Sequence, residues 1–100
     1  MDNQGNVKIR GKLYQSQSML NRTSAKEWIV EDYSENPVAI LNLETGDLNL
    51  KGALTDEMSS ITPGAGSEFI IKNENNIPVL LIDSFGNMKI LGEVYQYANP

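Results

Sequence analysis

The chain has 100 residues with a net charge of −5, and 40% of them are hydrophobic, which fits one small folded domain with a thin core rather than a disordered chain. The acidic balance provides no basic surface for phosphates, so we expect no nucleic-acid binding, and the lack of cysteine and histidine excludes disulfides, thiolate metal sites and the commonest general base. The sequence shows no apolar run long enough to span a membrane and no secretion signal in its first four residues.

The opening segment, residues 1–15, predicts a turn followed by one strand. Asp2 and Gly5 fit the first and fourth positions of a type I turn closed by a left-handed glycine. Apolar residues then alternate with polar ones, which predicts a strand with one buried face. The positions on this face are Val7, Ile9, Gly11 and Leu13. An unpaired apolar strand would promote aggregation, so we expect this segment to complete a sheet elsewhere, and we favour a sheet in a second copy of the chain.

The same pattern of two glycines around an alternating run returns near residues 42–55 and 83–96. The leading glycines, Gly5, Gly46 and Gly86, stand 41 and 40 residues apart. Each is followed six residues later by another glycine, and these are Gly11, Gly52 and Gly92. The second set falls on the buried phase of the strand, which indicates a close approach between backbones. The chain is therefore a repeat of about forty residues, and residues 1–15 hold only the last strand of a unit.

Residues 16–25 predict a loop between units. The loop contains Asn21-Arg22-Thr23, an N-glycosylation sequon, so Asn21 is a candidate for glycosylation if the protein is exported. At its end Ser24 precedes Glu27 by three residues, a pattern that also starts helices. The β-rich residues that follow favour a strand instead.

The first full unit, residues 26–55, predicts three antiparallel strands at 28–30, 38–43 and 48–54. Pro37 opens the second strand, where its missing N–H costs least. This strand is apolar on both sides, so both of its faces need to be covered. The glycine spacing indicates that the turn before Gly46 is one residue longer than the turn before Gly86.

A Pro/Gly loop, residues 56–66, leads to the second unit, residues 67–97, with strands expected at 69–72, 79–83 and 88–95. We predict an all-β fold of tandem three-stranded antiparallel meander units, packed as a sandwich or prism. Because each middle strand has two apolar faces, we expect packing between subunits. The alternative is a compact monomer in which the two units cover each other.

The carboxylates suggest metal binding or catalysis only weakly. The Asp-x-x-Gly-Asn pattern at 2–6 and 83–87 could offer oxygens to calcium, yet it lacks the further carboxylates of a loop site and is explained by a turn. A glycosidase needs two carboxylates at a fixed separation, which nothing here sets for the candidates Glu27, Glu31, Asp32, Asp56 and Glu57. We therefore expect no enzyme activity, no metal and no cofactor.

Aromatic residues provide one candidate ligand platform. Tyr14, Tyr95 and Tyr97 could stack on a glycan or a receptor, and Tyr95 and Tyr97 would point the same way from one strand. Packing across strands explains the same residues.

The stretch F-I-I-K-N…P-V-L-L-I-D-S-F-G-N-M-K-I-L-G-E-V-Y resembles β-repeat modules of phage tail-fibre shafts and of bacterial and archaeal surface or filament stalk proteins. The likeness covers residues 2–15 and 26–97, although the middle copy departs from it at residues 42–47. It implies a structural role in an elongated homomeric assembly outside the cell or on a virion, with no catalytic residues. We expect a structural subunit or module of an extracellular or virion filament or fibre, whose partner is another copy in a trimer or filament. A glycan- or receptor-binding module is the alternative.

Overall fold

The computed structural model describes residues 4–20, 26–32, 34–64 and 68–98, and every regular element within these ranges is a β-strand. The strands are β1 (Val7–Lys8), β2 (Leu13–Tyr14), β3 (Glu27–Glu31), β4 (Pro37–Asn42), β5 (Leu48–Leu50), β6 (Leu54–Thr55), β7 (Phe69–Lys72), β8 (Pro78–Ile82), β9 (Met88–Ile90) and β10 (Val94–Tyr95). The predicted all-β class is confirmed, and the alternative of a helix that continues past Glu27 is wrong. None of the described residues belongs to a helix that could cross a membrane.

Two sheets share one plan, with the strand orders β2-β5-β4-β3 and β6-β9-β8-β7. The last three strands of each order are antiparallel neighbours and form the predicted meander. The first strand comes from the preceding unit and runs parallel to its neighbour, with Leu13 opposite Leu48 and Leu54 opposite Met88. The units are therefore not independent three-stranded sheets. Each is a four-stranded mixed sheet that the previous unit completes.

The single strand expected over residues 7–13 is divided in two, because β1 ends at Lys8 and β2 begins at Leu13. The strands expected at 48–54 and 88–95 are divided in the same way. β5 ends at Leu50 and β6 begins at Leu54, while β9 ends at Ile90 and β10 begins at Val94. Between them the chain bends and passes from one sheet to the next. The apolar alternation continues through the bend, so the sequence pattern resembles that of one continuous strand.

The turns follow the predicted chemistry. Pro37 and Pro78 open β4 and β8, and a register shift lies opposite each of them. The Gly86 N–H donates to Asp83 O at 3.0 Å, whereas the Gly46 N–H donates to Asn42 O at 2.8 Å. The turn before Gly46 thus holds one more residue than the turn before Gly86, as the glycine spacing indicated. Both glycines have φ near +80° (82° and 81°), a conformation that favours glycine.

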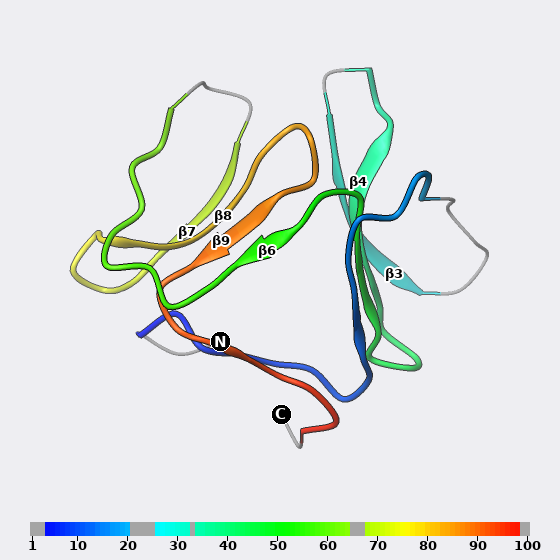
Figure 1. Cartoon of the computed structure of the whole chain (residues 1–100), viewed down its shortest axis with the longest axis horizontal. Coiled ribbons are helices and arrows are strands. Elements are labelled where there is room, and N and C mark those ends of the chain that lie inside the picture. The colour runs from blue at the N-terminus through cyan, green and yellow to red at the C-terminus, as the bar shows by residue number, and fades with distance from the viewer. Residues whose placement is uncertain (1–3, 21–25, 33, 65–67, 99–100) are drawn as a thin grey trace.

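The opening segment pairs within the chain. β1 runs parallel to β10, with Val7 opposite Val94 and Lys8 opposite Tyr95. The Val7 N–H donates to Glu93 O at 2.8 Å and the Ile9 N–H to Tyr95 O at 3.0 Å. In Figure 1 the blue first strand and the red last strand lie side by side, and with the two sheets they form three sides of the molecule. One edge of this strand thus pairs within its own chain, where we had expected a strand of a second copy.

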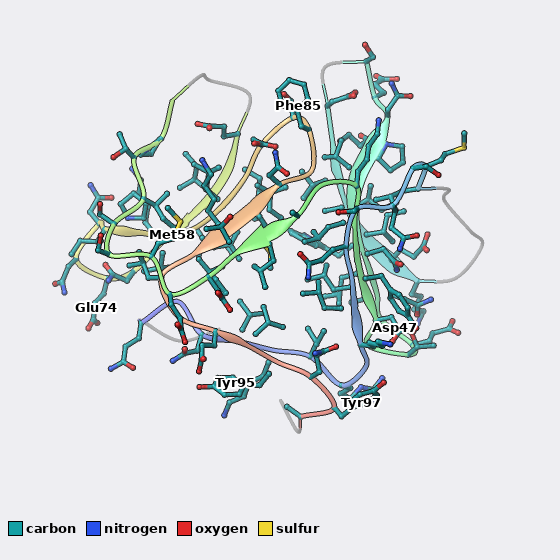
Figure 2. All side chains as sticks on the ribbon, in the orientation of Figure 1. Asp47, Met58, Glu74, Phe85, Tyr95 and Tyr97 are labelled. Carbon is teal, nitrogen blue, oxygen red and sulfur yellow. The ribbon has the colours of Figure 1, made fainter. Side chains whose placement is uncertain are left out.

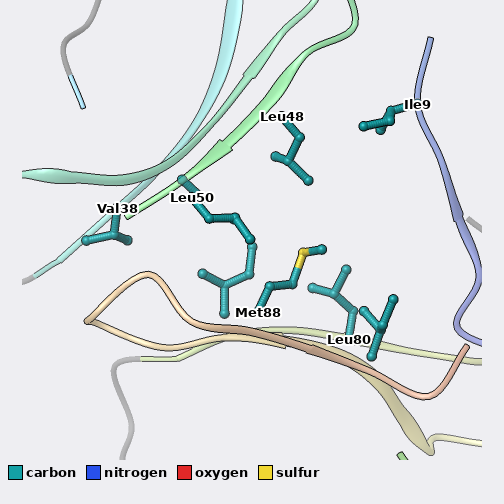
Figure 3. Packing of buried hydrophobic residues seen from close by; sticks show 9 residues of the cluster. Ile9, Val38, Leu48, Leu50, Leu80 and Met88 are labelled. Carbon is teal, nitrogen blue, oxygen red and sulfur yellow. The ribbon is translucent and has the colours of Figure 1, made fainter. Parts of the chain in front are cut away.

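Apolar side chains from all three sides fill the centre (Figure 3). The buried cluster contains Ile9, Val38, Ala39, Leu48, Leu50, Leu80, Ile82, Met88 and Ile90. On the other face of β4, Ile40 is also buried, and Leu20 from the loop after β2 lines the same surface hollow. Ile61, 41 residues after Leu20, is buried in the loop after β6. The outer face of β4, which we expected another subunit to cover, thus has a buried loop residue of the same chain beside it.

Candidate assembly face

Three equivalent joins hold the sides together. At each join a glycine of the bend faces an Asp or Asn that follows a turn glycine, and the pairs are Gly11 with Asp47, Gly52 with Asn87 and Gly92 with Asn6. A Cβ added to Gly11 would lie 2.7 Å from Asp47 N, and one added to Gly52 would lie 2.7 Å from Asn87 N. The separation at Gly92 from Asn6 N would be 2.8 Å. Real Cβ atoms do not approach backbone nitrogen so closely, so these three sites accept only glycine without a shift of the chain.

The polar side chain at each join accepts a backbone hydrogen bond from the residue after the glycine. The Lys12 N–H donates to Asp47 Oδ1 at 2.8 Å, the Ala53 N–H to Asn87 Oδ1 at 3.0 Å and the Glu93 N–H to Asn6 Oδ1 at 3.0 Å. In Figure 2 Asp47 lies beside the bend of the N-terminal segment. The same geometry at three places gives the molecule an approximate three-fold arrangement.

The third side is incomplete. The two sheets have four strands each, whereas β1 and β10 form a two-stranded ladder in the described part of the chain. In the complete sides the Lys51 N–H donates to Val38 O at 3.0 Å and the Leu91 N–H donates to Val79 O at 3.2 Å. Arg10 is the matching residue after β1, and none of the strands in the described ranges lies beside this edge. The described part of the chain thus has no strands equivalent to β4 and β3 next to β1, and we call this region the open side.

The atoms around the turn glycines also differ between the open side and the two complete sides. A Cβ on Gly86 would meet Val38 O at 2.6 Å, and one on Gly5 would meet Val79 O at 3.0 Å. At Gly46 the nearest atoms belong to Arg10 and Gly11 instead. The Arg10 side chain extends over this turn, where its Nη2 donates to Glu44 O at 2.7 Å. The strand carbonyl found near Gly86 and Gly5 is thus not among the nearest atoms at Gly46.

An apolar cavity of about 390 Å³ opens at this region. Its lining comes from β1 and from both sheets and consists of Val7, Ile9, Trp28, Leu41, Leu43, Leu48, Ile71, Leu80, Ile82 and Met88. Trp28 stays 36% exposed although its ring packs edge-on against Phe69 with centroids 5.0 Å apart. Leu43 is 53% exposed. The cavity lies between the two hairpins, where a third hairpin would complete the core.

The four residues predicted for assembly lie in different parts of the molecule. Val7 and Ile9 line the cavity, while Gly11 and Leu13 lie at the first join and in β2. Sequence reasoning missed Leu43 and Arg10. The exposed phase of an apolar residue directly after β4 was the available signal for Leu43, and nothing in the sequence marked Arg10.

The three candidate tyrosines are exposed side chains. The exposed fractions are 39% for Tyr14, 43% for Tyr95 and 73% for Tyr97. Tyr95 donates its hydroxyl hydrogen to Glu93 Oε2 at 3.1 Å, and Lys12 Nζ lies 5.6 Å from the Tyr14 ring centroid. Tyr97 has a positive φ of 54°, which breaks the alternation expected from Tyr95. Figure 2 shows the two rings at separate places along the last segment.

The candidate carboxylates lie on the surface. Glu57 hydrogen-bonds to Glu93, which raises the pKa of Glu57 and lowers the pKa of Glu93. Glu27 and Glu31 are the end residues of β3, and Asp83 Oδ1 accepts the N–H groups of Phe85 and Asn87 within its turn. Among the described residues no group of three or more Asp or Glu side chains is placed to hold a metal ion. Asn21, Asp2 and Asn3 lie outside the described residues.

Comparison with protein-family models, with curated proteins and with solved structures found no match for this chain.

Proposed function

We propose that this protein is a structural subunit or module of an extracellular or virion filament or fibre, and that it joins its neighbours through β-strands at the open side. The observation that carries the proposal is the apolar cavity beside the edge of β1 that no described strand occupies. Exposed strand edges pair readily with other strands, and contiguous exposed apolar surface is typical of interaction sites. The partner is another copy or module of the same kind, in a trimer or filament.

Two further edges support association. β3 and β7 are the last strands of their sheets, so each has one edge free of other described strands. The opposite edge is partly occupied by glutamine side chains, because the Leu13 N–H donates to Gln96 Oε1 at 2.9 Å and the Leu54 N–H donates to Gln15 Oε1 at 2.8 Å. Such capping reduces pairing at that edge. Each four-stranded sheet therefore has one edge capped by a glutamine and one edge suited to addition of strands.

The three exposed tyrosines favour a second candidate function, a glycan- or receptor-binding module. Tyrosine offers an apolar ring with a polar tip and is common at binding surfaces. Tyr97 is the most exposed of the three at 73%. A glycan array that stays blank while the protein forms assemblies would remove this alternative.

Light scattering across a wide range of protein concentrations tests the structural role. We expect association that grows with concentration and that weakens in Leu43→Lys, because this change places a charge at the mouth of the cavity. Ile77→Lys is the matched control, since Ile77 has a similar exposure of 49% and does not line the cavity. A monomer at all concentrations, or equal loss of association in both variants, would contradict the proposed role.

A further inference from the structure

The open side has the shape of a missing β-hairpin. In both complete sides the strand at the position of β1 pairs with a hairpin, β4–β3 for β5 and β8–β7 for β9. We propose that the open side binds an apolar β-hairpin with the pattern of β3–β4, supplied by a neighbouring module, and that this hairpin extends the β10–β1 ladder to four strands. The inference rests on the proposed function, because it names the partner that the open side receives.

The register of the bound hairpin follows from the two complete sides. Ile40 lies opposite Asn49, and Leu81 lies opposite Lys89. Lys8 stands 41 residues before Asn49, so the hairpin residue that matches Ile40 pairs with Lys8. The amides of Val7 and Ile9 already donate to β10. Because successive N–H groups of a strand alternate in direction, the amides of Lys8 and Arg10 face the open side.

Charge also favours such a hairpin. Lys8 and Arg10 lie along the edge of β1 and line a shallow hollow with Leu41 and Leu43. The segment 26–43, which contains β3 and β4, carries Lys26 against Glu27, Glu31, Asp32 and Glu35, a net charge of −3. An acidic hairpin of this type would approach a cationic edge. Its apolar inner side chains would then enter the cavity between Trp28 and Ile9.

The β1 strand of an intact second copy is not the occupant of the open side. That strand is held in a closed ring by three parallel ladders, β1–β10, β2–β5 and β6–β9. The occupant is therefore a β-hairpin rather than the edge strand β1 of an intact copy.

A synthetic peptide with the sequence of residues 26–43, added to the full chain, tests this inference. We expect saturable binding by calorimetry and at least about tenfold slower amide hydrogen exchange at Lys8 and Arg10, because new ladder hydrogen bonds protect edge amides. The control peptide has Ile40→Pro, which removes one ladder donor. It should neither bind nor slow exchange at these two amides.

A variant of the full chain tests whether the peptide binds at the edge of β1. Lys8→Pro removes an edge donor and leaves the Val7 and Ile9 bonds to β10, so it should weaken peptide binding by about fivefold or more, the effect of one lost hydrogen bond. Lys8→Ala should bind like the natural chain. Equal affinity for Lys8→Pro, or unchanged exchange at Lys8 and Arg10, would overturn the inference. If Lys8→Pro does not fold, the exchange measurement on the natural chain decides.

The two proposals fail separately. Peptide binding by a chain that stays monomeric would contradict self-assembly and support the hairpin site. Association of the chain without peptide binding or edge protection would support the structural role and overturn the hairpin site.

Discussion

Gly52 and Asn87 meet across the join between β6 and β9, where a Cβ on Gly52 would lie 2.7 Å from Asn87 N and the Ala53 N–H donates to Asn87 Oδ1 at 3.0 Å. This contact brings together a bend of one unit and a turn of the next. Because the same contact recurs at Gly11 with Asp47 and at Gly92 with Asn6, the three joins together determine how the sides close around the core.

Substitution of the join glycine should destabilise the fold. Gly52→Ala places a methyl group against backbone atoms, and we expect it to lower the free energy of unfolding by about 1–3 kcal/mol, the range for overpacking. Gly64→Ala is the matched control, because its Cβ would have Glu68 Oε2 at 3.8 Å as its near neighbour. Urea unfolding of both variants measures the difference. Equal stability of the two variants would show that the close approach does not constrain the chain.

The hydrogen bond at the joins can be tested by substitution of the polar side chain that accepts it. Asn87→Ala removes the acceptor for the Ala53 N–H, and we expect a loss of about 1 kcal/mol in unfolding free energy. Asp47→Asn at the Gly11 join is the matched variant, because it retains an acceptor for the Lys12 N–H and copies Asn87. It should therefore stay close to the natural chain in the same urea experiment. A loss as large for Asp47→Asn as for Asn87→Ala would contradict the role of the hydrogen bond.

The first strand contributes to the core of its own chain. Ile9 is only 5% exposed within the buried cluster, so Ile9→Ala should cost about 2–4 kcal/mol of unfolding free energy. Phe85→Ala is the control, because Phe85 is 75% exposed and points outward from its turn in Figure 2. Surface changes of this kind usually fall within about 0.5 kcal/mol. An Ile9→Ala chain as stable as the control would mean that β1 does not dock in cis.

The turn after β3 should make stability depend on pH. Asp32 Oδ1 accepts the N–H groups of Asn36 and Ser34, each at 2.9 Å, and the backbone hydrogen bond from Asn36 holds the pKa of Asp32 below its ordinary value. A depressed folded-state pKa adds stability above the unfolded-state pKa, and this contribution is lost as pH falls through the folded-state pKa. Acid should therefore weaken this turn.

Asp32→Asn removes the charge and retains the acceptor. The matching residue in the next unit is already an asparagine, Asn73, which accepts from Asn75 N at 2.9 Å and Ile77 N at 3.1 Å. Urea midpoints measured from neutral pH into the acid range should fall less for Asp32→Asn than for the natural chain. Parallel curves for the two proteins would rule out a contribution from Asp32.

The repeat and the local structure could be predicted from the sequence, and the connections between sheets could not. Glycine spacing and alternation identified the turns before Gly46 and Gly86 and the strand starts at Pro37 and Pro78, because these depend on residues close in the chain. The parallel ladders join residues far apart, such as Val7 and Val94, and short strands leave no local pattern for such pairing.

The same contrast between local and long-range structure holds for the candidate site. The alternating face of residues 7–13 predicted an apolar strand with one buried side, yet pairing with another copy was expected because residues 1–15 hold only the last strand of a unit. Leu20 and Ile61 are 41 residues apart and both are buried, so their spacing was an available signal that loops shield the outer faces. Charge on the edge of β1 became informative only after the open side was seen.

The parallel alignment of β1 with β10 has a mechanical consequence. In a parallel pair, tension applied at the start of one strand and the end of the other acts along the strands, so the bonds from Val7 to Glu93 and from Ile9 to Tyr95 must rupture together instead of one after another. Under tension the molecule would resist extension until this ladder ruptures, and the rest of the fold would unfold only afterwards.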